Sequence, residues 1–395
     1  MNDLLKRLNM EEISPLFDEC YENVRNDESI PDWLTEEFIK KAHSDYSILP
    51  TQLDTLLTQR EKIVKNDDLV MFAKVLYEML SLDADGRVIF ADLAFPETPD
   101  GKNLVGVFPM LAHFVRVYSE LKDMGIPEEI LQNTFRMLDL YLSETAQKRG
   151  YAIFPVGGFV WTNLAKSKLM LRIDRLNLEL RKDFIGAYGL KNTNGDVKIL
   201  MKEGTPVDEN GFYARNTPAF VTEFTETDEY FLGYEANNAT ATVKKEPTKL
   251  LKSQWSLFYK PGDYIVSVHI PTKGTFEPQV VDDALSKGKE IFKNYFPHIK
   301  PTAYFCFSWL LAPELTLFLK PTSNILNFQE RFHKFPYHEC TEKDVFTYVF
   351  HVAMPKTLKE YDFSSLPEDN SLQKKIKDYY ISGKTVHESS GFFPY

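Results

Sequence analysis

The stretch YIVSVHIPTKGTFEPQVVDDAL, residues 264–285, contains the residue types of a phosphate-binding turn. Its alternation predicts a strand over 264–270, a loop containing Lys273 and Gly274, and a helix from about Pro278. Backbone N–H groups and the positive end of the helix dipole favour an anion at such a helix start. The sequence therefore predicts an anion site over 271–276, with an ordinary turn as the alternative.

Two polar side chains near the ends of expected strands could act in catalysis. His269 shares a strand face with Ser267 and lies at the carboxyl end, where α/β sheets bind ligands. It could contact a ligand there, or it could simply bond a backbone carbonyl. In YFCFSWLLAPEL, residues 304–315, Ser308 and Cys306 share a face. From the pattern alone we expect a structural hydrogen bond for Ser308 and packing for Cys306.

Standard catalytic and metal motifs are absent from the sequence. It contains no His-Glu-x-x-His, Gly-x-Ser-x-Gly or Gly-x-Gly-x-x-Gly pattern, and the SGKT at 382–385 lacks the first glycine of a P-loop. His338, Glu339 and Cys340 are adjacent, so their side chains diverge in most backbones, and no metal is expected. The cysteines are odd in number and far apart, which indicates free thiols and a reducing compartment.

Charge and hydropathy exclude two classes of partner. The formal net charge is −11 and the lysines are scattered, so no basic face for nucleic acid is expected. No apolar stretch reaches the length of a membrane span, and charges interrupt the first residues before a signal core could form. We expect a cytoplasmic protein.

The period of the apolar residues changes near residue 160. Helical spacing dominates from 30 to 150, whereas strands separated by turns follow, and then strands and helices alternate. This predicts an α+β protein, with an N-terminal all-α domain followed by a mixed β-sheet domain flanked by helices. The expected parts are 1–160, 161–355 and a polar extension over 356–395 with one short helix. Within the second part, the strands expected over 264–270 and 302–311 should be parallel neighbours, and further elements are expected as a helix over 323–333 and a strand over 345–352.

The succession SVHIP, DDALSKGKEIF, CFSWLLAPEL and SNILNFQERF resembles the C-terminal domain of bacterial acyltransferase domain-containing proteins, whose fold is similar to the GNAT fold. The preceding helices more loosely resemble the N-acyltransferase N-terminal domain that accompanies it. The resemblance covers about 165–355 well and 30–165 weakly.

This resemblance implies an N-acyltransferase that moves an acyl group from acetyl-CoA or another acyl-CoA to a small-molecule or peptide amine. In such folds the two central strands splay apart and acyl-coenzyme A lies between them. Carried over by position, the coenzyme would contact Ile270, Pro271, Lys273, Gly274 and Thr275.

By the same resemblance, His269 would be the base and Ser308 the partner of the leaving thiolate. The Arg/Gln-x-x-Gly-x-Gly/Ala signature of GNAT enzymes is absent, and Lys273-Gly274 stands in its place. This absence favours the alternative, a non-catalytic protein with the same fold that binds a ligand or partner. A hydrolase that uses Cys306 is a third alternative.

Overall fold

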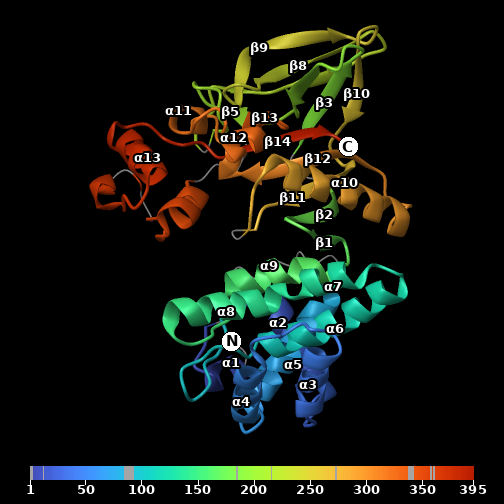
Figure 1. Cartoon of the computed structure of the whole chain (residues 1–395), viewed down its shortest axis with the longest axis vertical. Helices are drawn as coiled ribbons and strands as arrows, with labels where there is room; N and C mark the ends of the chain where they lie inside the picture. The colour runs from blue at the N-terminus through green and yellow to red at the C-terminus, as the bar shows by residue number, and fades with distance from the viewer. Residues whose placement is uncertain are drawn as a thin grey trace. The chain divides into compact units, whose positions relative to one another are not determined.

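The computed structural model describes residues 3–11, 13–83, 93–183, 186–214, 216–271, 274–336, 342–355, 358 and 361–395. The chain divides into two compact units, Met1–Asp174 and Arg175–Tyr395 (Figure 1). The first unit is helical and the second contains mixed sheet with flanking helices, which confirms the α+β fold class. The boundary expected near residue 160 falls inside a helix, α9, that belongs to the first unit.

Helices form most of the first unit. They are α1 (Asp3–Arg7), α2 (Pro15–Val24), the 3-10 helix η1 (Asp32–Leu34), α3 (Glu36–Ser44), α4 (Leu53–Ile63), α5 (Asp67–Leu82), α6 (Val107–Asp123), α7 (Glu128–Phe135), α8 (Met137–Arg149) and α9 (Val156–Lys166), followed by strand β1 (Met170–Ile173).

Local signals in the sequence explain several of these helix ends. The side chain of Asn66 accepts hydrogen bonds from the first-turn N–H groups of α5, and Gly150 ends α8 at a φ of 80°. Helices α7 and α8 meet at Arg136, which follows the last residue of α7 and precedes the first residue of α8. Phe135 of α7 packs against Phe114 of α6 with ring centroids 4.9 Å apart, so these helices share a core.

The first sheet of the second unit has the order β2–β11–β12–β14–β13. Its strands are β2 (Leu176–Lys182), β11 (Tyr264–His269), β12 (Pro301–Ser308), β13 (His333–Pro336) and β14 (Ser389–Pro394). As predicted, β11 and β12 are parallel and are joined through helix α10 (Pro278–Tyr295). The apolar stripe of α10 is buried, and the Tyr304 hydroxyl of β12 donates to the Leu285 carbonyl at 3.0 Å. Helix α10 therefore covers one face of this sheet (Figure 1).

A second, antiparallel sheet packs against the other face. It has the order β10–β3–β4–β8–β7, and β9 also pairs with β8. Its strands are β3 (Ala187–Asn192), β4 (Val197–Met201), β7 (Phe224–Glu226), β8 (Tyr230–Asn237), β9 (Thr242–Leu251) and β10 (Trp255–Tyr259), and the short strands β5 (Pro206–Val207) and β6 (Phe220–Val221) pair beside it.

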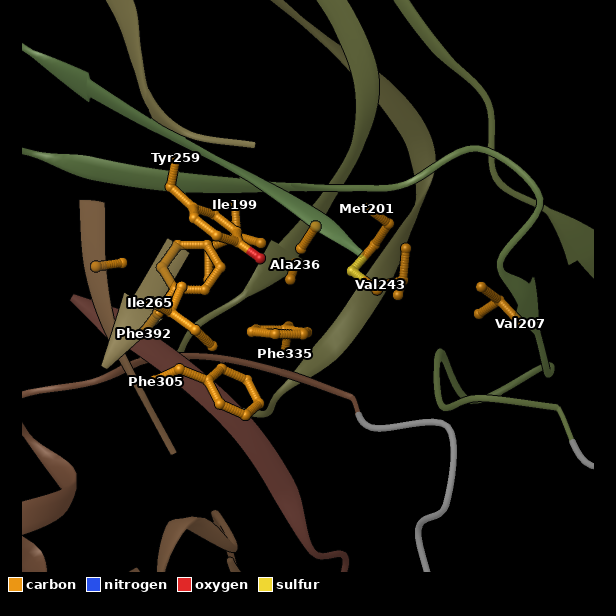
Figure 2. Packing of buried hydrophobic residues seen from close by; sticks show 12 residues of the cluster. Ile199, Met201, Val207, Ala236, Val243, Tyr259, Ile265, Phe305, Phe335 and Phe392 are labelled. Atoms are coloured by element: carbon orange, nitrogen blue, oxygen red, sulfur yellow. The ribbon is translucent and has the colours of Figure 1, made fainter. Parts of the chain in front are cut away.

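The core of the second unit lies between the two sheets. Figure 2 shows Phe305, Phe335 and Phe392 of the first sheet facing Ile199 and Met201 of the second. Apolar side chains thus cover the central strands on this face, while α10 covers the opposite one. A polar side chain on either face of these strands is consequently removed from water and needs a hydrogen-bond partner.

The chain after β12 differs from the sequence-based expectation. Its helices are the 3-10 helix η2 (Trp309–Leu311), α11 (Leu315–Phe318), α12 (Asn324–Gln329), the π-helix η3 (Val345–Phe350), the 3-10 helix η4 (Phe363–Ser365) and α13 (Ser371–Ile381). The short helix expected within 356–395 is present as α13. The strand expected over 302–311 ends at Ser308, and the helix expected over 323–333 ends at Gln329.

The strand expected over 345–352 is wrong. Val345, Phe346, Val349 and Phe350 are all buried, and their one- and three-residue intervals suit a helix although their types favour strands. The residues expected as a polar extension over 356–395 instead end in β14, which pairs with both β12 and β13. None of the described helices combines the length and hydropathy that a membrane crossing requires.

Candidate active site

The parallel strands β11 and β12 separate toward their carboxyl ends. Their pairing runs from Tyr264 opposite Pro301 to Ser267 opposite Phe305 and stops there. Beyond that point β11 remains paired with β2 as far as His269, whereas β12 remains paired with β14 as far as Ser308. The predicted divergence is therefore confirmed. Open strand ends of this kind are where α/β sheets usually bind ligands.

His269 lies at the end of β11 and contacts a buried carboxylate. Its Nε2 is 3.0 Å from Oε2 of Glu179 on β2, and Glu179 is only 2% exposed. Because a carboxylate can only accept, Nε2 is the donor in this contact. The imidazole is half-buried and held in one orientation. A histidine in this state can accept a proton from a substrate through Nδ1.

Glu179 belongs to a row of polar side chains on one face of β2. Asn177, Glu179 and Arg181 alternate with buried leucines, and Arg181 Nη1 is 3.9 Å from Glu179 Oε2. The row continues to Asp183, which accepts a hydrogen bond from the hydroxyl of Tyr259, and burial strongly raises the pKa of that tyrosine. Asn177, Glu179 and Asp183 are buried and Arg181 is half-buried, so these groups have little contact with water.

Sequence reasoning missed Glu179. The pattern LNLELR suggests a strand with its leucines inward and its polar residues toward solvent. In the structure Asn177 and Glu179 are buried as well as the leucines, and β2 pairs with β11. The polar residues of LNLELR are visible in the sequence, but only the pairing register, with Ser267 opposite Glu179, shows that Glu179 lies near His269.

Ser308 lies at the end of β12, and its side chain is on the opposite face of the sheet from that of His269. It shares its face with Cys306 and Tyr304, the face that α10 covers, and its Oγ accepts the N–H of Leu310 at 3.1 Å. Ser308 thus caps η2, the structural role that its position suggested. The structure brings His269 and Ser308 to the diverging ends of neighbouring strands but does not align their side chains as a pair.

Cys306 is unsuited to be a nucleophile. Its side chain is completely buried, and burial raises the pKa of the thiol far above its ordinary value. A thiolate, which is the reactive form, is therefore not populated at neutral pH. This observation removes the main support for a cysteine hydrolase.

The loop after β11 leads to the uncapped start of α10. Gly274 and Thr275 are exposed, and Gly274 has a φ of 110°, a conformation that side chains rarely adopt. Glu277 precedes α10 without a side-chain cap, so the first-turn N–H groups remain available. Ile270 and Pro271 are half-buried where β11 ends, whereas Lys273 lies outside the described residues.

The described residues contain no group of His, Cys, Asp and Glu side chains arranged to hold a metal ion. His338, Glu339 and Cys340 lie outside the part of the chain that the structure describes.

Comparisons with known proteins bear on both units. The sequence profile of the family described as GNAT-like C-terminal domain matches residues 170–393. A crystal structure of an acyltransferase mutant in complex with octanoyl-CoA aligns with a TM-score of 0.63 at 14% identity, over 99% of this chain and 98% of that one.

An acyltransferase in complex with decanoyl-CoA and teicoplanin aligns with a TM-score of 0.61 at 15% identity, over the same shares of the two chains. A search of curated protein sequences gave no match. At these identities the alignments establish a shared fold.

Proposed function

Because the chain belongs to the family with a GNAT-like C-terminal domain, we propose that it is an acyl-CoA-dependent N-acyltransferase. The observation that carries the proposal is the opening between β11 and β12 with the His269–Glu179 pair at its edge. The solved structures with this fold include acyltransferases that bind octanoyl-CoA and decanoyl-CoA, which supports acyl-CoA as the donor.

In the proposed reaction, the acceptor is a primary or secondary amine. Its nitrogen forms a bond to the thioester carbonyl carbon, the carbon–sulfur bond breaks, and coenzyme A leaves as a thiolate. Nδ1 of His269 takes the proton that the amine loses, and the Glu179 carboxylate stabilises the resulting imidazolium. The proton then passes to the thiolate, so the products are an amide and free coenzyme A.

Ser308 is proposed to assist the departure of the thiolate. Its Oγ accepts the Leu310 N–H, which leaves the hydroxyl proton able to donate to sulfur. On the β11 side, Ile270, Pro271, Lys273, Gly274 and Thr275 are proposed to contact the coenzyme. Exposed Gly274 and Thr275 at the start of α10 suit this role because backbone N–H groups there can approach an anion.

The acyl donor, the acceptor and the cellular compartment can be proposed more closely. Acetyl-CoA and longer acyl-CoAs are both proposed donors, and the octanoyl and decanoyl chains bound by proteins of this fold make longer chains the first to test. The teicoplanin bound by one of them supports a small-molecule or peptide amine as acceptor. We place the reaction in the cytoplasm, where a reducing environment keeps Cys20, Cys306 and the thiol of coenzyme A free.

The helical first unit is proposed to be the N-acyltransferase-type N-terminal domain that the sequence suggests over 1–160. The support is that acyltransferases of this fold align over 99% of the chain, which includes these helices.

A donor and acceptor panel tests the proposal. Melting temperatures are measured with acetyl-, octanoyl- and decanoyl-CoA, because a ligand that binds the native state raises its stability. Release of the coenzyme A thiol is then followed with an amine panel that includes amino sugars and peptides. Amine-dependent thiol release supports an acyltransferase. Stabilisation by acyl-CoA without thiol release for any amine supports the non-catalytic alternative, and the lack of any acyl-CoA effect contradicts both.

A further inference from the structure

Arg175 is a buried cation that has no acidic partner among the described residues. It occupies the tight turn before β2, its side chain is 8% exposed, and its Nη1 has no hydrogen-bond partner among the described residues. Burial lowers the pKa of its guanidinium, and no neighbouring carboxylate offsets this effect. An arginine stays charged even so, and a buried charge left unpaired is costly. Within the part of the chain that the structure describes, this guanidinium therefore has no counter-ion.

The guanidinium lies against the loop at the start of α10. Nε donates to the Thr275 carbonyl at 2.7 Å, and Cζ lies 5.4 Å from the centre of the Phe276 ring. A side-chain carbon at Gly274 would lie 3.5 Å from Cδ of Arg175 and 4.0 Å from Cζ. Phe276 is held in turn by Phe328 of α12, with ring centroids 5.0 Å apart. The cation is thus fixed beside the exposed glycine rather than free to turn away.

Three features that favour an anion converge at this point. They are the unpartnered Nη1 of Arg175, the uncapped first turn of α10 without acidic residues, and the open approach at Gly274. A guanidinium can bind phosphate oxygens through two parallel hydrogen bonds. The loop follows directly on His269, where the thioester would react. The first anionic group reached from the sulfur of coenzyme A is its pyrophosphate, whereas the 3′-phosphate lies beyond, on the ribose.

We propose that Arg175, with the loop Gly274–Phe276 and the first turn of α10, binds the pyrophosphate of the acyl-CoA. This inference rests on the proposed function for the identity of the ligand. Arg175 would supply the charge that a glycine-rich signature supplies through backbone N–H groups in other proteins of this fold.

Binding measurements on Arg175→Gln test the inference. We expect octanoyl-CoA and its 3′-dephospho derivative to bind about ten- to a hundredfold more weakly, because one charge-assisted bidentate contact is lost. S-octanoyl-pantetheine, which has no pyrophosphate, should bind wild type and variant alike. If Arg175→Gln weakened the binding of octanoyl-CoA but not of its 3′-dephospho derivative, the assignment to the pyrophosphate would be overturned.

Arg331→Gln is the matched control. Arg331 also contacts α10, but its Nη2 already pairs with Asp282 at 2.7 Å. A general effect of net charge would weaken binding equally in both variants and would overturn the proposal, whereas a specific site weakens binding only in the Arg175 variant.

Arg175→Met separates binding from folding. Because the buried charge is unpaired in the free protein, we expect the variant to melt at the wild-type temperature or above and yet to lose most of the octanoyl-CoA shift. A lower melting temperature with unchanged affinity would make Arg175 purely structural. Melting temperatures measured with inorganic pyrophosphate distinguish failure of the Arg175 proposal from failure of the proposed function. If octanoyl-CoA does not bind the wild type, the acyltransferase proposal fails. An Arg175-dependent shift with pyrophosphate still supports the anion site, and its absence overturns it.

Discussion

Replacing Glu179 by glutamine tests the centre of the proposed mechanism. Glu179 does not contact substrate in the proposal but positions His269, through the 3.0 Å contact between Oε2 and Nε2. Glutamine keeps the size and one acceptor but removes the charge that stabilises an imidazolium. A hydrogen bond to a charged group is worth about 1.5–3 kcal/mol. If that amount is lost in the transition state, kcat/KM falls by roughly 10- to 150-fold.

The assay is thiol release from octanoyl-CoA with an accepted amine, alongside the dissociation constant of octanoyl-CoA. We expect kcat to fall while the affinity for the donor stays near that of the wild type, because the carboxylate acts on the proton transfer. His269→Ala should lose more activity. The double variant should be no slower than His269→Ala, since Glu179 acts only through the imidazole.

A second histidine–glutamate pair supplies the control. His387 Nδ1 lies 2.6 Å from Glu314 Oε1, and the His387 ring stacks on Phe212 at 3.8 Å. Glu314→Gln makes the same chemical change in the same unit and should leave kcat/KM unaltered. A fully active Glu179→Gln protein beside an inactive His269→Ala protein would refute the positioning role. Loss of activity in Glu314→Gln alone would move the base to His387.

The remaining predictions concern the coenzyme contacts and pH. Ser308→Ala should lower kcat and reduce the free energy of unfolding by about 1 kcal/mol through loss of the η2 cap. Ser323→Ala removes the cap of α12 and is the control. An equal loss of stability in both variants, with kcat reduced only in Ser308→Ala, would separate the catalytic role of Ser308 from its capping role. Lys273→Ala should weaken acyl-CoA binding by about 1–2 kcal/mol in calorimetry without altering the melting temperature. Gly274→Val should lower both affinity and stability, the latter by about 1–3 kcal/mol, because valine rarely adopts a φ of 110°. Burial, and then the charge of Asp344, raise the pKa of Glu388 from 4.5 to about 8. The native state therefore binds this proton more tightly than the unfolded state does. The free energy of unfolding measured in urea should fall between about pH 4.5 and 8, by about 1.4 kcal/mol per pH unit at most. A Glu388→Gln protein whose stability changes equally with pH would contradict this prediction.

Local patterns in the sequence predicted the elements around the site. The strand ending at His269, the loop with Gly274 and the helix from Pro278 follow from alternation, a turn residue and a helical stripe, and each signal lies within a few residues. The parallel pairing of β11 and β12 followed as well, because a helix between two strands constrains their direction.

Contacts between distant segments could not be read in this way. Glu179 and His269 are ninety residues apart and Arg175 and Thr275 a hundred, and only the pairing of β2 with β11 brings them together. The sequence predicts a polar extension where the last strand, β14, forms, because the strands that pair with β14 precede it by many residues. The sequence predicts a strand where the π-helix η3 forms, because packing determines its conformation against the preference of its valines and phenylalanines.

The missing glycine signature illustrates the same limit for function. A signature records one solution to a physical requirement, here the neutralisation of phosphate charge at a helix start. The requirement can also be met by a cation from another segment. Arg175, which lies in a turn a hundred residues before Thr275, is such a cation. A buried guanidinium without a counter-ion among the described residues is costly in the free protein, and a bound anion would offset that cost. Under this reasoning the absent signature is not evidence against coenzyme binding. It predicts instead that one side chain contributes a large share of the binding free energy, so that a single substitution at Arg175 should weaken acyl-CoA binding about ten- to a hundredfold.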